Sequence, residues 1–134
     1  MDKDENQVKL NKEKIIVLDF WSTNCSICFE KFPDLEEIYQ KYKTEKNIEI
    51  YTVNVPVGRD KFHRTIKILD SIGYKFPKLY TRSMKEIEDS LHFNKFPHLI
   101  IIKNNRIRYD GVLVTEKYRR IYNIESEINR LLKE

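Results

Sequence analysis

The chain has 134 residues, which predicts a single domain over residues 1–134 that is large enough to fold without disulfide bridges. Hydrophobic residues make up 40% and aromatic residues 12% of the chain, a composition that excludes an intrinsically disordered protein. Acidic and basic residues are interspersed and sum to a net charge of +4, which favours a solvated surface over a nucleic-acid-binding stripe.

The start of the chain, MDKDENQVKLNKEK, is polar and has no apolar segment of the kind that directs secretion. No apolar run elsewhere approaches the length of a membrane span, so we expect no stable membrane insertion. Two locations remain open: the cytoplasm, or export of a protein whose leader is not part of this sequence. Residues 1–11 are predicted to be a frayed lead-in, in which Val8 and Leu10 alternate as in a short edge strand.

The first predicted elements are a strand and a helix that meet at the two cysteines. Ile15 to Trp21 is an apolar run of branched residues, typical of a strand buried on both faces. From Cys25 to Tyr42 the apolar residues recur at steps of three and four, which predicts a helix that the internal Pro33 should kink.

The later elements are predicted from the same periodicities. They are a strand over 48–55, a helix from about 62 that stops at Gly73, a short strand within 74–80, a short helix over 84–91, strands over 98–103 and 106–110, and a final helix carrying Tyr118, Ile121, Ile124, Ile128 and Leu131. Asn104 and Asn105 predict a hairpin turn because asparagine tolerates positive φ. Strands separated by helices predict parallel pairing, and the turn adds an antiparallel pair, so the fold class is α/β.

The only cysteines, Cys25 and Cys28, form a C-x-x-C pair at the first turn of the predicted helix. A thiolate at Cys25 would face unpaired backbone N–H groups and the positive end of the helix dipole, which lower its pKa. We therefore expect Cys25 to attack a partner's disulfide and the less exposed Cys28 to resolve the mixed disulfide. Half of a zinc site is the alternative, but the three histidines have no paired spacing, so we expect no metal.

Two further residues support dithiol chemistry. Asp19 lies within the buried strand, where desolvation would raise its pKa and suit it to accept the proton of Cys28; otherwise it points outward or caps a backbone N–H. Pro97 precedes the strongest strand, and a cis bond there would expose backbone to an extended substrate, although the residues alone leave cis and trans open. The adjacent His98 is either a proton carrier or an ordinary strand residue.

The segments LDFWSTNC, CSIC and KFPHLIIIKNNRIRYDG, with Pro33 between them, follow the order of the thioredoxin superfamily pattern. From about Val8 to the C-terminal helix, the chain resembles the TlpA/ResA-type thiol–disulfide oxidoreductases most closely. This resemblance implies a thioredoxin-like fold, in which helices flank a central mixed β-sheet. It also implies an extra β-α insert over 58–80, before the cis-proline.

The resemblance also implies residue roles. Cys25 is the nucleophile, Cys28 the resolving cysteine, Asp19 the buried acid and Pro97 the cis-proline. The implied substrate contacts are Trp21, Asn24, Ser26, Ile27 and Phe96. We expect a monomer without a cofactor that acts on protein dithiols and disulfides, as a reductant outside the cytoplasm by family resemblance.

Four positions depart from the family pattern and leave alternatives open. Asn24 stands where a bulky residue is usual, and Ser26-Ile27 separates the cysteines without a proline. Lys31 replaces a frequent glutamate, and His98 replaces a common threonine. These departures favour the alternative of a redox-inactive interaction module. A third hypothesis, a peroxiredoxin-like peroxidase, rests on Ser22 three residues before Cys25 but lacks the required upstream proline.

Overall fold

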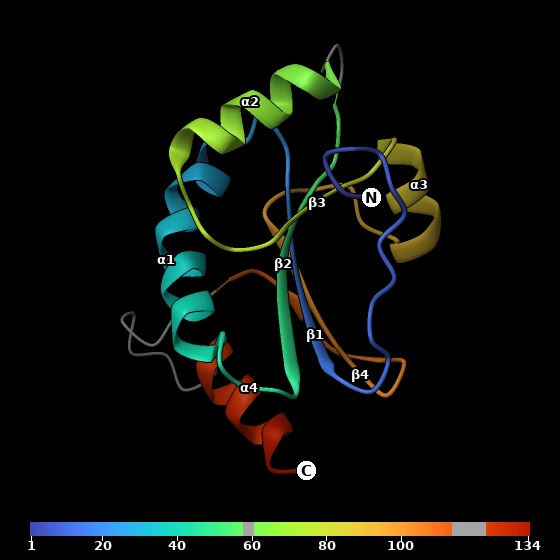
Figure 1. The fold of residues 1–134 in the computed structure, drawn as a ribbon. Coiled ribbons are helices and arrows are strands. Elements are labelled where there is room, and N and C mark those ends of the chain that lie inside the picture. The colour runs from blue at the N-terminus through green and yellow to red at the C-terminus, as the bar shows by residue number, and fades with distance from the viewer. Residues whose placement is uncertain (58–60, 114–122) are drawn as a thin grey trace.

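The computed structural model describes residues 1–57, 61–113 and 123–134. Within these ranges the chain forms five strands and four helices (Figure 1). In chain order they are β1 (Ile15–Trp21), α1 (Ser26–Tyr42), β2 (Ile48–Asn54), α2 (Phe62–Ile72), β3 (Lys78–Tyr80), α3 (Met84–Leu91), β4 (His98–Lys103), β5 (Arg106–Gly111) and α4 (Ile124–Leu132). The predicted α/β class is confirmed. Of the β-α insert expected over 58–80, residues 58–60 lie outside the described ranges, and the rest forms α2 followed by β3, a helix before a strand.

The strands form one mixed sheet in the order β3-β2-β1-β4-β5. β1 pairs in parallel with β2 and antiparallel with β4, so parallel pairing was wrong for this second neighbour. The reason is the path of the chain. β3 ends at Tyr80, level with the end of β2, and β4 begins at His98, opposite Phe20 near the end of β1. Because the connection through α3 stays at one end of the sheet, the next strand must run backwards.

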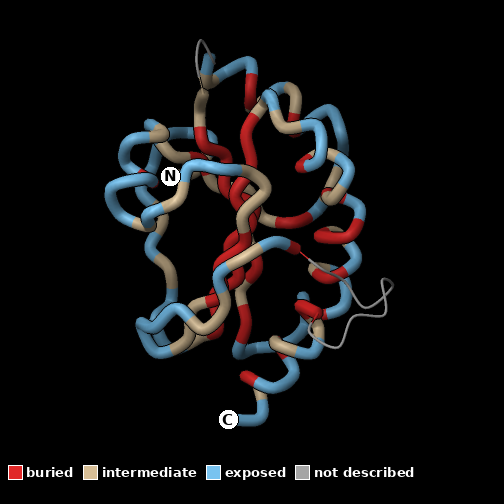
Figure 2. The backbone as a smooth tube through the Cα atoms, turned by 180° about the vertical axis from the view of Figure 1, so that it is seen from behind, coloured by how far each residue is buried: buried red, intermediate tan, exposed pale blue. Residues whose placement is uncertain are grey.

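The central strand β1 is buried along its whole length, as predicted (Figure 2). Its side chains alternate between two hydrophobic clusters, with Val17 and Trp21 in one and Ile16 and Phe20 in the other. Figure 1 shows α1, α2 and α4 on one side of the sheet and α3 on the other. The first cluster is the larger, and it contains Cys28.

The predicted end of the second helix at Gly73 and the predicted hairpin are confirmed. Gly73 caps α2 with φ 79°, and Asn104 and Asn105 form the β4–β5 turn with φ of 54° and 62°. α1 continues through Pro33 as one helix to Tyr42. In the final helix the buried face is Ile124, Ile128 and Leu131, whereas the predicted Tyr118 and Ile121 lie outside the described residues.

The first residues of the chain lie against the sheet without forming the predicted edge strand. Val8 and Leu10 are partly buried between exposed neighbours, but no residue from 1 to 14 belongs to a strand. Leu10 packs on the α3-side cluster, because the segment crosses that face and does not follow an edge. The pairing at the edge is made by Met1, whose backbone N donates to the Tyr80 carbonyl at 2.9 Å and whose carbonyl accepts from the Tyr80 N–H at 2.8 Å.

Candidate active site

The two cysteines lie where β1 leads into α1, at the predicted junction. Cys25 is the N-cap of α1 and forms a disulfide with Cys28, with the two Cα atoms 5.3 Å apart. The Cys28 N–H donates to Cys25 Sγ at 3.2 Å. Cys25 is partly buried and Cys28 is 2% exposed, so a partner reaches Cys25 first. The predicted order of exposure is confirmed.

The loop before Cys25 is fixed by its own hydrogen bonds. The Ser22 hydroxyl donates to Asn24 Oδ1 at 2.8 Å, and the Cys25 N–H donates to the Ser22 carbonyl at 3.2 Å. The first turn of α1 contains no acidic residue. Because no carboxylate offsets the positive end of the helix dipole there, a thiolate at Cys25 is the anion that this helix end can stabilise.

Trp21, the last residue of β1, packs against the first turns of α1. Its ring is fully buried and meets Phe29 and Phe32 edge to face, at centroid distances of 5.4 and 5.3 Å. These contacts hold the first turns of α1 on the end of β1. Trp21 has no exposed surface, so in this structure it offers no contact to a partner, unlike the role that the family resemblance implied.

Asp19 is buried beneath α1. It is 2% exposed, and it shares its face of β1 with Val17 and Trp21, which belong to the same cluster as Cys28. Its Oδ1 has no hydrogen-bond partner. Burial raises the pKa of Asp19 from 3.8 to about 7, and the positive charge of Lys31 opposes that rise. The outward-pointing alternative is therefore wrong, and the carboxyl group can exchange a proton near neutral pH.

Lys31 is a residue of the site that the sequence showed only as a departure from the family. It follows Cys28 by three positions and so lies on the same side of α1. Its Nζ donates to the Leu113 carbonyl at 2.8 Å, and its charge acts on the buried Asp19. The spacing of three residues from Cys28 was the signal that could have placed Lys31 on the same side of α1 as the resolving cysteine.

The Phe96–Pro97 peptide bond is cis, as the family resemblance implied. β4 begins at the next residue, opposite Phe20 of β1, so Pro97 lies at the end of the sheet where β1 leads into α1. Phe96 and Cys25 both pack against the larger core cluster. The cis-proline and the dithiol, which are far apart in the sequence, are thus brought to one end of the sheet.

The other predicted contact residues differ in exposure. Asn24, Ser26 and Ile27 are exposed around Cys25, and Ile27 exposes 52% of its surface. Phe96 is partly buried. An exposed isoleucine between two cysteines is available to an apolar side chain of a partner, and its role as a contact stays a prediction.

His98 is directed away from the dithiol. It shares its face of β4 with Ile100, which belongs to the α3-side cluster. Its ring stacks on Phe93 at a centroid distance of 4.0 Å, and Nε2 lies 2.5 Å from Asp110 Oδ1. Across the described parts of the chain, no three His, Cys, Asp or Glu side chains gather as a metal site.

Comparisons with known sequences agree with this arrangement. A family model described as Thioredoxin-like matches residues 12–107. The thiol-disulfide oxidoreductase ResA of Bacillus thuringiensis is 33% identical over 82 residues, which are 60% of this chain and 44% of that protein. The chain therefore spans less than half the length of this relative.

Solved structures show the same fold. The thioredoxin domain of a thiol-disulfide oxidoreductase from Bacteroides vulgatus superposes with a TM-score of 0.72 at 23% identity, over 99% of this chain and 89% of that one. StoA from Bacillus subtilis gives 0.66 at 19% identity, over 81% and 82%. The fold, the C-x-x-C pair at the start of α1 and the match over most of the sequence lead to one conclusion: the chain belongs to the thioredoxin-like family.

Proposed function

We propose that the protein is a thiol–disulfide oxidoreductase that exchanges its Cys25–Cys28 pair with protein partners. The observation that carries this proposal is the arrangement of three groups: a partly buried Cys25 at a helix N-terminus, a buried Cys28 one turn later, and Asp19 within the core below. A purely structural disulfide between Cys25 and Cys28 would add little stability, because a bridge between residues three positions apart closes a very small loop.

The first step uses the reduced protein. The Cys25 thiolate attacks one sulfur of a partner's disulfide, forming a bond between Cys25 and that sulfur while the partner's own S–S bond breaks. The released sulfur leaves as a thiolate and takes up a proton from water. The uncompensated N-terminus of α1 stabilises the attacking thiolate, and the exposed Ile27 and cis-Pro97 supply the surface on which the partner rests.

The second step releases the partner. Ionised Asp19 accepts the proton of Cys28, and the resulting thiolate attacks Cys25 Sγ. The Cys25–Cys28 bond forms as the mixed disulfide breaks, so the partner gains two electrons and this protein loses two. The product is the disulfide seen in the structure. The raised pKa of Asp19, about 7, makes its carboxylate a better base than an exposed aspartate.

The direction of electron flow and the location belong to the same proposal. Resemblance to the TlpA/ResA type supports a monomeric reductant of protein disulfides that works outside the cytoplasm. The interspersed charges of the sequence argue against nucleic acid as a partner. Among the described residues, no helix combines the length and apolarity needed to cross a membrane.

The test is reduction of the disulfides of insulin by the protein with a chemical thiol as electron source. Cys25→Ser should abolish catalysis, whereas Lys67→Ala, a change at an exposed position of α2, should leave most of it. A titration of the Cys25 thiol accompanies the assay. Wild-type reduction by the Cys25→Ser protein, or a Cys25 pKa like that of a free thiol together with slow exchange, would favour the redox-inactive interaction module.

A further inference from the structure

The end of the sheet opposite the dithiol brings together three segments of the chain. β1 and β2 both begin there, since Ile15 pairs with Ile48, and the β4–β5 turn lies beside them, since Ile102 pairs with Ile16. Figure 1 shows this end of the sheet far from α2 and from the junction at which β1 leads into α1. The three segments comprise residues 9–14, 43–47 and 103–106.

These segments carry exposed basic side chains that have no ionic partner. We call this set the basic end, and it consists of Lys9, Lys12, Lys43, Lys46 and Arg106. No ion pair joins any of them to a residue in the described ranges. Their charges are therefore available to the negative charges of another molecule.

Acidic side chains do not offset this positive charge fully. Glu49, near the start of β2, lies 3.4 Å from the ammonium group of Lys14, so its charge is already used. Within the three segments the acidic residues are Glu13 and Glu45, which leaves the basic residues in excess. Acidic and basic residues are interspersed along the sequence, but the fold collects unpaired basic side chains at one end.

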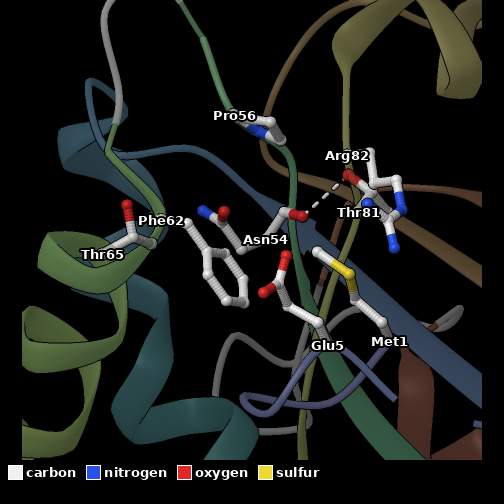
Figure 3. A pocket seen from close by; sticks show the side chains of 8 residues that line it. All are labelled: Met1, Glu5, Asn54, Pro56, Phe62, Thr65, Thr81 and Arg82. Atoms are coloured by element: carbon white, nitrogen blue, oxygen red, sulfur yellow. Dashed lines mark hydrogen bonds between the residues drawn. The ribbon is translucent and has the colours of Figure 1, made fainter. Parts of the chain in front are cut away.

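A hollow at the same end adds an apolar surface. Its volume is about 320 Å³, and its lining includes Val8, Leu10, Ile16 and Ile102 together with Lys9, Lys12 and Lys14. The cavity between α2 and the first residues of the chain differs from it, because there Glu5 and Arg82 bring charges of both signs to a volume of about 220 Å³ (Figure 3). The hollow at the basic end suits a molecule that is anionic at one point and apolar at another.

We propose that the basic end binds the surface of a bilayer that contains anionic phospholipid. Headgroup phosphates contact basic side chains from several segments at once, and the apolar lining of the hollow contacts the hydrocarbon part of a lipid. Nucleic acid is another common polyanion, but the three segments contain no aromatic residue on which a base could stack. The dithiol, at the opposite end of the sheet, faces away from the membrane. No redox step is involved, so the proposal does not depend on the chemistry of Cys25 and Cys28.

The experiment is co-sedimentation of the full chain with vesicles at low ionic strength. One set of vesicles holds equal parts of phosphatidylcholine and phosphatidylglycerol, and the other holds phosphatidylcholine alone. The protein should sediment with the anionic vesicles only, and raised salt should release it because exposed charges are screened. Lys12→Gln, Lys46→Gln and Arg106→Gln, one from each segment, should each weaken binding roughly two- to fivefold, and the triple variant by roughly the product of the three effects.

Matched controls separate the basic end from the net charge of the protein. Lys67→Gln on α2 and Lys85→Gln on α3 remove the same charge from exposed positions outside the three segments, and both should bind as the wild type does. Orientation is tested by alkylation of Cys25 with iodoacetamide after reduction, which should proceed equally fast with and without anionic vesicles. This measurement needs no catalysis, so its outcome is distinct from that of the insulin assay.

Four results would each overturn the proposal. They are binding to phosphatidylcholine vesicles as strong as to the anionic ones, or to neither; control variants that weaken binding as much as the variants of the basic end; alkylation of Cys25 that anionic vesicles suppress; and a duplex oligonucleotide that binds the protein more tightly than the anionic vesicles do.

Discussion

The two faces of the sheet treat an acidic side chain in opposite ways. On the face under α1, Asp19 is buried in the larger core cluster and its Oδ1 has no hydrogen-bond partner. On the face that carries α3, the side chain of Asp110 is 51% exposed and pairs with His98, which stacks on Phe93. Asp19 is thus cut off from water and lacks a partner at Oδ1, whereas Asp110 keeps both water and a partner.

This contrast indicates that the acidic residue under α1 has a chemical role, whereas the one on the α3 face has a structural role. An acidic side chain that keeps both water and a partner destabilises the fold little, and a single such surface pair contributes little to stability. A carboxyl group deprived of water and of a partner at Oδ1 is destabilising when it is ionised, so its presence under the dithiol calls for a chemical role. The following predictions, in decreasing order of expected effect, test whether the α1 face alone carries that role.

The largest effect is expected from Cys28→Ala. Without the resolving thiol, Cys25 should remain bound to the partner as a mixed disulfide, and turnover should fall to background. Non-reducing electrophoresis and mass spectrometry would detect the adduct, with Lys67→Ala on α2 as the control that forms none. Multiple turnover by Cys28→Ala would show that resolution does not need the buried cysteine.

Asp19→Asn should stabilise the protein at alkaline pH. Because the pKa of Asp19 is raised to about 7, the folded state holds its proton to higher pH than the unfolded chain, and stability is lost as pH rises from about 4 through 7. The asparagine variant avoids this loss, worth up to about 4 kcal/mol at pH 9 for a shift of roughly three units. Denaturant unfolding at pH 4 and pH 9 measures the difference, which should nearly vanish at pH 4.

The same pH series has a clear contrary outcome. If Asp19→Asn were equally stable or less stable than the wild type at pH 9, then Asp19 would be stabilised as a carboxylate by its surroundings. The α1 face would then hold its acid as the α3 face does, and the comparison would fail.

Lys31→Met should shift the pH dependence of the resolving step. The wild-type rate should rise with pH through about 7 as Asp19 ionises. Removing the positive charge of Lys31 raises the pKa of Asp19 further, so the midpoint moves to higher pH and the rate at pH 7 falls roughly twofold. Stopped-flow decay of the mixed disulfide measures this step.

The controls for this prediction are charge matched. Lys31→Arg keeps the positive charge and should keep the midpoint, and Lys67→Met removes an exposed charge on α2 and should change nothing. A midpoint that does not move in Lys31→Met would mean that this lysine does not influence the acid in solution.

The smallest effect is expected from His98→Gln on the α3 face. Loss of the contact with Asp110 should lower the free energy of unfolding by about 0.2–1 kcal/mol, as for a polar pair on neighbouring strands. The pH profile of disulfide reduction should stay as in the wild type, because His98 shares its face with Ile100 and not with Asp19. A shifted pH profile in His98→Gln would indicate that His98 takes part in proton transfer.

The strand β1, the helix α1 and the position of the dithiol were predictable because each follows from a local pattern. The apolar run from Ile15 to Trp21 predicts a strand buried on both faces, and the helical spacing after Cys25 predicts a helix with one buried face. The burial of Asp19 followed from its place in that run. Local periodicity was therefore sufficient for the half of the site that is continuous in sequence.

The rest depends on contacts between distant residues. Nothing in the residues of β4 says that it runs against β1, since that direction is set by which end of the sheet the chain leaves after β3. The alternation of Val8 and Leu10 matched a strand, yet the same burial pattern arises in a segment that crosses a sheet face. The cavity between α2 and the first residues of the chain is lined by residues from positions 5, 54, 65 and 82, so no local sequence motif could predict it.

The hydrogen bond from the Cys28 N–H to Cys25 Sγ makes one backbone amide an internal reporter. In the oxidised protein this N–H meets a neutral sulfur, whereas in the reduced protein it would meet a thiolate and form a stronger, charge-assisted hydrogen bond. Deuterium should therefore replace its hydrogen more slowly after reduction. The exchange of this single amide could follow the oxidation state of the protein without any reagent that touches the sulfurs.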